Sequence, residues 1–276
     1  MIKRIFTDMD GTLLDSQGRV RESNAQLIRK AEIPMTLVSA RAPMEMQEAI
    51  DGLGLTGPQV AFNGGLIFEM KDSKLRPLHT DNIPQETANS LLAEINHQFP
   101  QISLSYYDLN HWYCATIDEG IRYEYELTGC APTLVKMDDF LKAPLNTFKI
   151  MLITFEEETM QALIQHLNHL QLKDVSIQRS GAFYLEITSQ SAKKSQGIAY
   201  ILKKEGLSPS ETAAFGDGHN DLPMFSMVGT PIAMENGSQE VKKQAKYITR
   251  SNDQDGVGWG IKKYLTKGKL WSLFEI

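Results

Sequence analysis

Short apolar runs alternate with helix-like segments along the first part of the chain. Apolar runs of this length are typical of buried strands, and strands that alternate with helices predict parallel pairing. In chain order the predicted elements are a strand at 2–7, a helix at about 22–31, a strand at 35–38, a helix at about 43–53 and a strand at 59–62. The turn sequence Asn63–Gly65 then leads into Leu66–Phe68, which predicts a hairpin.

The pattern changes from about residue 84. An amphipathic helix beginning near Pro84 carries apolar residues at helical spacing, namely Ala88, Leu91, Leu92, Ile95 and Phe99. The further predicted elements are strand-like alternation at 102–106 and 111–116, a strand at 148–155, a helix at about 157–170 and a hairpin at 175–187 that turns at Ser180–Gly181. This order is typical of an α+β fold and not of repeated strand–helix–strand units.

The alternation of strands and helices returns from Ser195 onward. The predicted elements are a helix at 196–204, strands at 212–215, 230–233 and 247–249, helices at 221–227 and 238–245, and a final helix from about 256. We therefore predict an α/β fold, with a Rossmann-like parallel-sheet core that has helices on both faces and is interrupted by an inserted α+β domain. The predicted core comprises residues 1–82 and 188–276, and the insertion comprises residues 83–187.

Composition and charge narrow the classes of function. The chain of 276 residues is 42% apolar and 22% charged, which is ordinary for a soluble globular protein. Its formal net charge of −6 argues against a nucleic-acid partner, since phosphate binders normally carry an excess of Lys and Arg. No apolar run is long enough for a signal peptide or a membrane span, so we expect a cytoplasmic location and no membrane partner. Cys114 and Cys130 are too few for a disulfide framework, and we expect reduced thiols.

Two carboxylates follow the first apolar run. Side chains two apart on an extended strand point to the same side, so we expect Asp8 and Asp10 to converge while Met9 points away. Two carboxylates so near each other remain ionised together only if a cation or a proton lies between them. The pair therefore indicates a magnesium site or an acid–nucleophile pair. The alternative is an ordinary acidic turn after a strand.

A second acidic cluster, Gly216–Asp221, follows the apolar run Ala213–Phe215. Parallel strands end on one edge of a sheet, so Asp217 can meet Asp8 although they are far apart in sequence. Oxygen ligands from two strand ends, with no His or Cys at suitable spacing, favour magnesium over zinc or copper. The alternative is a glycine-rich acidic surface turn.

Two other predicted helix entrances carry groups that could bind an anion. After the strand at 35–38, the Ser39 hydroxyl and the backbone amides at Ala40 and Arg41 precede a helix and could hold a phosphate, although Ser in this position is more often only a helix cap. Lys193 and Lys194 precede the next helix and could supply a positive charge. A pair of solvated lysines is the alternative.

Taken together, these segments resemble the four motifs of the haloacid dehalogenase superfamily of phosphohydrolases. The motifs occur in the expected order as Asp8–Leu13, Ser39, Lys194 and Gly216–Asp221. The turn at Asn63–Gly65, the long insertion between the second and third motifs, and Asp255–Val257 make the chain similar to the Cof-like subfamily with the larger α/β cap. The resemblance spans the whole chain and implies that the insertion is a cap that selects the substrate.

The resemblance implies a role for each acidic residue. Asp8 would be the nucleophile that forms an aspartyl-phosphate, and Asp10 would protonate the leaving group and then deprotonate water. The implied cofactor is Mg²⁺, held by Asp8, the backbone carbonyl of Asp10, and Asp217. Asp221 would support the metal's waters or Lys194 from behind.

The resemblance also implies the phosphate-binding groups. Five residues would bind the phosphate or the substrate: Met9, Ser39, Ala40, Lys194 and Asn220. Many relatives have Thr-Gly where this chain has Ser39–Ala40, which keeps the hydroxyl but stiffens the backbone. Lys194 fits the family's third motif better than Lys193, because Ser195–Ile198 continues the Lys-x-x-Gly-apolar pattern.

The implied function is a magnesium-dependent phosphatase that acts on small phosphorylated metabolites, with sugar phosphates as the first expectation. Alternatives in the same class are a flavin mononucleotide phosphatase, a pyridoxal phosphate phosphatase and a phosphosugar mutase. The alternative from another class is a non-catalytic phospho-ligand sensor, or a receiver-like domain merely phosphorylated on Asp8. The sequence does not indicate an oligomeric state.

Overall fold

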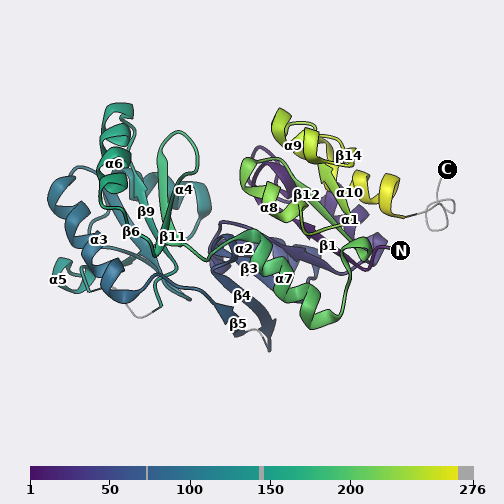
Figure 1. Ribbon diagram of the computed structural model, residues 1–276, viewed down its shortest axis with the longest axis horizontal. Helices are drawn as coiled ribbons and strands as arrows, with labels where there is room; N and C mark the ends of the chain where they lie inside the picture. The colour runs from purple at the N-terminus through teal and green to yellow at the C-terminus, as the bar shows by residue number, and fades with distance from the viewer. Residues whose placement is uncertain (73, 143–145, 267–276) are drawn as a thin grey trace. The chain divides into compact units, whose positions relative to one another are not determined.

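The computed structural model describes residues 1–72, 74–142 and 146–266 (Figure 1). The chain forms two compact units. Unit one comprises Met1–Arg41, Met46–Leu78 and Lys193–Ile276, and unit two comprises Ala42–Glu45 and His79–Ala192. The assignment of residues 83–187 to an inserted cap domain stays a prediction.

Unit one contains a five-stranded parallel sheet, as the alternating pattern predicts. The strand order is β14-β13-β12-β1-β2, so β1 lies between strands from opposite ends of the chain. The strands are β1 (Arg4–Thr7), β2 (Met35–Leu37), β12 (Thr212–Gly216), β13 (Thr230–Ala233) and β14 (Tyr247–Ile248). A second sheet has the order β3-β4-β5, formed by β3 (Gln59–Ala61), β4 (Leu66–Lys71) and β5 (Lys74–Thr80), and it belongs to unit one up to Leu78.

Helices pack on both faces of the parallel sheet, which confirms the predicted fold class. Phe6 and Ala214 pair across β1 and β12, and they pack in one apolar cluster with α7 and α8. Phe215 points to the other face, where it closely approaches Gly260 of α10. The helices of unit one are α1 (Glu22–Ala31), α7 (Lys194–Glu205), α8 (Leu222–Phe225), α9 (Gln239–Gln244) and α10 (Gly256–Gly260), together with α2 (Pro43–Leu53) from Met46 onward (Figure 1).

Unit two has the α+β character that its sequence predicts. Its sheet has the order β10-β11-β9-β6-β7-β8, and the neighbouring strands are antiparallel except for β7 and β8. The strands are β6 (Ser103–Tyr107), β7 (Trp112–Cys114), β8 (Thr133–Leu134), β9 (Lys149–Ile153), β10 (Val175–Arg179) and β11 (Tyr184–Ser189). The long helices α3 (Gln85–Gln98) and α6 (Glu157–His169) share an apolar core with Ile150 and Leu152 of β9.

The region between residues 117 and 147 contains elements that the sequence pattern does not predict. Helix α4 (Glu119–Thr128) begins after Asp118, whose carboxylate accepts a hydrogen bond from the backbone N–H of Ile121, and a four-residue helix, α5 (Met137–Phe140), follows later. Helix α4 buries the charged Glu124 and exposes Tyr123, so the chemical type of these residues does not indicate which face is buried.

Candidate active site

The predicted site residues lie at the carboxyl ends of the parallel strands of unit one. Asp8 follows β1 directly, and Asp217 follows β12, the strand hydrogen-bonded to β1. Ser39 comes two residues after the end of β2, on the other side of β1. Lys194 is the first residue of α7. The topology therefore brings together groups from both ends of the chain, as parallel strands predict.

Three carboxylates and one lysine form the centre of this site. One carboxylate oxygen from each of Asp8, Asp217 and Asp221 lies within 4.8 Å of one from each of the others. Lys194 Nζ donates hydrogen bonds to Asp8 Oδ1 and, at 2.8 Å, to Asp221 Oδ1. The Lys194 and Asp221 side chains are 1% and 0% exposed, so these charges interact in a poorly solvated environment.

The two lysines at the start of α7 have different surroundings. Lys194 is buried and reaches two carboxylates, whereas Lys193 is exposed. The carbonyl oxygen of Lys193 would lie 2.2 Å from a Cβ at Gly64, where φ is +106°. The glycine turn after β3 therefore packs against the beginning of α7. The structure places Lys194, not Lys193, beside Asp8.

The chain turns sharply after Asp8. Strand β1 ends at Thr7, and Met9–Leu13 forms an irregular helical turn in which Gly11 has a φ of +75°. A Cβ at Gly11 would lie 2.6 Å from Asp217 Oδ2, so glycine permits both the turn and the close approach of the second acidic loop. Strand alternation does not place Asp10, because β1 ends at Thr7. The Asp10 charge nevertheless lies near enough to Asp8 to add to the rise in the Asp8 pKa that burial causes.

Asp10 instead forms an ion pair with Arg41. The Arg41 guanidinium donates to both Asp10 oxygens, from Nη2 to Oδ1 at 2.7 Å and from Nε to Oδ2 at 2.9 Å. The Asp10 side chain is 57% exposed, in contrast to the buried Asp8. From the sequence, only the backbone amide of Arg41 was expected to bind a ligand. Arg41 directly follows Ser39–Ala40 after β2, next to the strand that Asp8 and Asp10 follow. This position could have indicated a role for its side chain.

Thr12 is a second candidate site residue for which the sequence predicted no role. Its buried hydroxyl donates a hydrogen bond to Asp217 Oδ1 at 2.6 Å. The contact joins the turn after β1 to the loop after β12. The signal for it was the position of Thr12 within the same motif as Asp8.

Asp221 organises the loop that carries Asp217. Its Oδ2 accepts hydrogen bonds from the backbone N–H groups of Asp217, at 2.9 Å, and of Gly218, at 3.0 Å. Its other oxygen accepts the bond from Lys194. A Cβ at Gly216 would lie 2.6 Å from this carboxylate, so the backbone passes close beside it. Asp221 therefore links the loop to the lysine.

The electrostatics follow from burial. Burial raises the pKa of Asp8 well above its usual range, although the Lys194 charge opposes the shift. Burial also raises the pKa of Asp217, to about 6, and the hydrogen bond from Thr12 opposes this. Burial lowers the pKa of Lys194, but the Asp221 and Asp8 carboxylates outweigh it and the net shift is upward. The site has three carboxylates and one lysine. Carboxylate oxygens are the ligands that a hard divalent cation such as Mg²⁺ prefers.

The remaining predicted phosphate-binding residues lie on the segments that follow β1, β2 and β12. Ser39 is buried, and its Oγ accepts a hydrogen bond from the backbone N–H of Arg41 at 3.1 Å. The Met9 side chain is buried, so only its backbone can serve a ligand at the turn. Ala40 and Asn220 are partly buried in the loops that follow β2 and β12.

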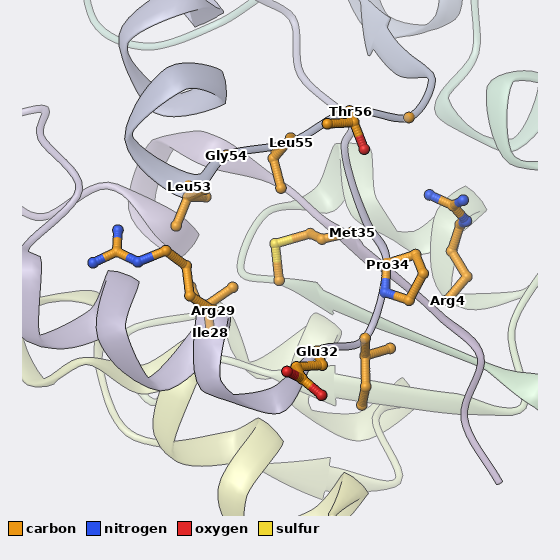
Figure 2. A pocket seen from close by; sticks show the side chains of 12 residues that line it. Arg4, Ile28, Arg29, Glu32, Pro34, Met35, Leu53, Gly54, Leu55 and Thr56 are labelled. Carbon is orange, nitrogen blue, oxygen red and sulfur yellow. The ribbon is translucent and has the colours of Figure 1, made fainter.

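A separate pocket lies at the opposite edge of unit one (Figure 2). Its volume is about 380 Å³, and it is lined by residues that include Arg4 at the start of β1 and Met35 at the start of β2. Figure 2 shows Met35 near its centre, with Leu53 and Leu55 close by. The Arg4 guanidinium is bound by Glu205 and Thr36. None of the predicted site residues lines this pocket.

The fold and the site together define the class of the protein. The family model of the haloacid dehalogenase-like hydrolases matches residues 5–261, and the chain belongs to this family. The resemblance found in the sequence, including its Cof-like character, is therefore confirmed. The chain is a phosphatase of the haloacid dehalogenase type, which favours catalysis over the alternative of a phospho-ligand sensor.

Several known proteins are similar to this chain over almost its whole length. Two of them are YcsE and YwtE of Bacillus subtilis, both 5-amino-6-(5-phospho-D-ribitylamino)uracil phosphatases. YcsE is 27% identical and YwtE 26% identical to this chain. Each alignment covers 96% of this chain, and it covers 96% of YcsE and 99% of YwtE. A haloacid dehalogenase-like hydrolase from Bacteroides thetaiotaomicron has a TM-score of 0.83 at 27% identity and covers 95% of this chain and 99% of its own. A subclass IIB sugar phosphatase has the same fold, with a TM-score of 0.78 at 20% identity over 94% of this chain and 98% of its own.

Within residues 1–72, 74–142 and 146–266, no helix has the length and apolar character that crossing a membrane requires.

Proposed function

We propose that this protein is a magnesium-dependent phosphatase that hydrolyses phosphomonoesters of small, polyhydroxylated metabolites through a phosphoryl group carried on Asp8. The observation that supports the proposal most is the buried cluster of Asp8, Asp217 and Asp221, with Lys194 on the Asp8 oxygen. Such a cluster is unfavourable for stability by itself, and buried like charges of this kind are typical of functional sites.

Asp8 is the proposed nucleophile. Lys194 stabilises its ionised form against the effect of burial, and an ionised carboxylate can attack phosphorus without prior loss of a proton. The attack would form a bond between an Asp8 oxygen and phosphorus and break the bond from phosphorus to the leaving oxygen. Water would then hydrolyse the acyl phosphate and restore Asp8.

Asp10 is the proposed general acid and base. It lies two residues from the nucleophile, and its carboxylate is exposed enough to meet a substrate oxygen. Asp10 would give a proton to the leaving oxygen in the first step and take one from water in the second. Arg41, which donates to both of its oxygens, would hold the carboxylate in place.

Mg²⁺ would be held by Asp8, by the backbone carbonyl of Asp10 and by Asp217, with Asp221 behind them. When bound, it would offset the repulsion between the carboxylate and the phosphate dianion. The buried, carboxylate-rich centre around Lys194 fits such an ion. Lys194, Ser39 and Asn220, together with backbone groups at Met9 and Ala40, would bind the oxygens of the transferring phosphate.

The proposed substrate class rests on the relatives and on unit two. The two Bacillus subtilis relatives act on a phosphorylated ribityl chain, and the solved relative of the same fold is a sugar phosphatase. Unit two would be the cap that selects the leaving group, because the proposed chemical groups all lie in unit one. Flavin mononucleotide, pyridoxal phosphate and a mutase reaction are the competing possibilities, and product analysis separates a mutase from a phosphatase.

The test is release of inorganic phosphate from a panel of phosphomonoesters, with and without Mg²⁺. We expect turnover of sugar or polyol phosphates that needs Mg²⁺ and is lost in Asp8→Asn. The matched control is Asp51→Asn, which changes an exposed carboxylate on α2 and should leave turnover unchanged. Turnover that is independent of Mg²⁺, or that persists in Asp8→Asn, would contradict the proposal.

A further inference from the structure

The two acidic loops of the site are held together by a third loop that contributes no carboxylate ligand. This loop, Met234–Ser238, follows β13 and lies beside the loop after β12. The backbone N–H of Ser238 donates to the carbonyl oxygen of Asp217 at 3.0 Å. A Cβ at Gly237 would lie 3.1 Å from the Asp217 Cα, so the two loops are in close contact.

The same loop binds the turn after β1 through a side chain. Asn236 Nδ2 donates a hydrogen bond to the carbonyl oxygen of Gly11 at 2.7 Å. Gly11 also lies close to Asp217, because a Cβ at Gly11 would be 2.6 Å from Asp217 Oδ2. Asn236 thus acts on the backbone immediately after Asp10, whose carbonyl is a proposed metal ligand.

Asn252 supports this contact from the other side. Its backbone N–H donates to Asn236 Oδ1 at 3.1 Å, which orients the amide so that its nitrogen faces Gly11. The Asn252 side chain is buried and donates from Nδ2 to the carbonyl oxygen of Leu14 at 2.9 Å. The two asparagines therefore bind the turn after β1 at its middle residue, Gly11, and at Leu14, directly after its last residue.

We propose that Asn236, oriented by Asn252, is a positioning residue that sets the distance between the two carboxylate-bearing loops and thereby the affinity for Mg²⁺. Neither asparagine needs to touch the ion or the substrate. A hydrogen-bonded carbonyl at Gly11 fixes the turn that carries Asp8 and Asp10, while the Ser238 amide fixes Asp217 in the same loop-to-loop arrangement. Groups of this kind orient metal ligands without binding the metal. This inference rests on the proposed function.

The test is a calorimetric Mg²⁺ titration of the purified full chain without substrate, together with kcat and KM. Asn236→Ala removes both hydrogen bonds. Asn236→Asp keeps the oxygen that accepts from Asn252 but replaces the donor to Gly11 with a repulsive oxygen. We expect both variants to bind Mg²⁺ about tenfold more weakly. Saturating Mg²⁺ should restore most of kcat, because the reacting groups themselves are intact.

The control is Glu235→Gln on the same loop, whose side chain is exposed and whose substitution should leave Mg²⁺ affinity unchanged. Melting temperatures of all variants report any loss of folding, and the Asp variant remains informative if the Ala variant fails to fold. Wild-type affinity in Asn236→Asp would overturn the positioning role while leaving the phosphatase proposal intact. A wild-type protein that neither binds Mg²⁺ nor releases phosphate would overturn both.

Discussion

Lys194 and Lys193 are adjacent in sequence, but the Lys194 side chain is buried and the Lys193 side chain is exposed. Substitution of one is therefore a control for substitution of the other. Lys194→Met should lower kcat by about 10²–10³-fold, because a charge that stabilises the transferring phosphate is lost from a buried site. Lys193→Met should change kcat little, since that side chain is exposed. Steady-state kinetics at saturating Mg²⁺ make the comparison. Equal losses in the two variants would contradict the assignment of Lys194.

Arg41 gives a second prediction at the residue scale. Arg41→Ala removes the ion pair that holds Asp10, so protonation of the leaving group should slow and kcat for alkyl phosphates should fall about tenfold. An aryl phosphate such as p-nitrophenyl phosphate leaves without a proton and should be affected much less. The matched control is Arg76→Ala, which removes an exposed ion pair with Glu69. Equal losses for both leaving groups would show that Arg41 does not act through Asp10.

The partly buried Asp217 carboxylate lowers the free energy of unfolding at neutral pH. Its pKa is raised to about 6 in the folded protein, above the ordinary 3.8. The folded state therefore holds the proton more tightly, and stability falls as pH rises from about 4 to about 6 and stays low above that. Asp217→Asn should raise the free energy of unfolding by about 2 to 3 kcal/mol at neutral pH in the presence of a chelator, and less near pH 4. Urea denaturation at both pH values measures this, and equal stability of the variant and wild type at neutral pH would contradict it.

At the scale of elements, the parts predicted correctly are those that a periodic pattern or a motif specifies locally. The strand ends that deliver Asp8 and Asp217 follow from apolar runs that stop at acidic residues, and the parallel sheet brings them together. The turn after Asp8 could not be predicted from strand alternation, because Gly11 reverses the backbone there. The Arg41–Asp10 pair depends on a tertiary contact between residues that no local pattern connects. Helix α4 has local signals at both ends, the Asp118 cap and Gly129, but its buried Glu124 hides the pattern.

Unit two contains a buried charge cluster on the α4 side of its sheet. Lys149 is 3% exposed and lies 3.5 Å from Glu186, and its ammonium stands over the Tyr107 ring. Glu124 of α4 is also buried, which raises its pKa, while Lys149 and the Tyr184 hydroxyl oppose this shift. The cluster therefore depends on one lysine to balance its acids.

Lys149→Met should destabilise the chain by about 3 to 5 kcal/mol at neutral pH, because it leaves buried carboxylates without their positive partner. The loss should shrink in acid, since the carboxylates with raised pKa take up protons there. Glu158→Gln, on the exposed first turn of α6, is the control. Thermal melts across the pH range test this, and a Lys149→Met loss that does not change with pH would contradict the electrostatic explanation.

At the scale of the whole molecule, we propose that the chemistry and the recognition of the leaving group have separate structural origins. Every proposed chemical group lies in unit one, which combines the beginning and the end of the chain in one parallel sheet. Unit two is formed by a continuous stretch of chain plus Ala42–Glu45. Exchange of polar residues on the unit two sheet should therefore alter KM values across a substrate panel while leaving the need for Asp8 unchanged.

The central claim is that the phosphoryl group passes through Asp8. The most direct measurement is rapid acid quenching of the enzyme during turnover of its best substrate with Mg²⁺, followed by peptide mass analysis. We expect one phosphoryl group on the peptide that contains Asp8. This group should be absent when Mg²⁺ is left out and absent in Asp8→Asn. Rapid turnover without any label on that peptide, or label on a different residue, would contradict it.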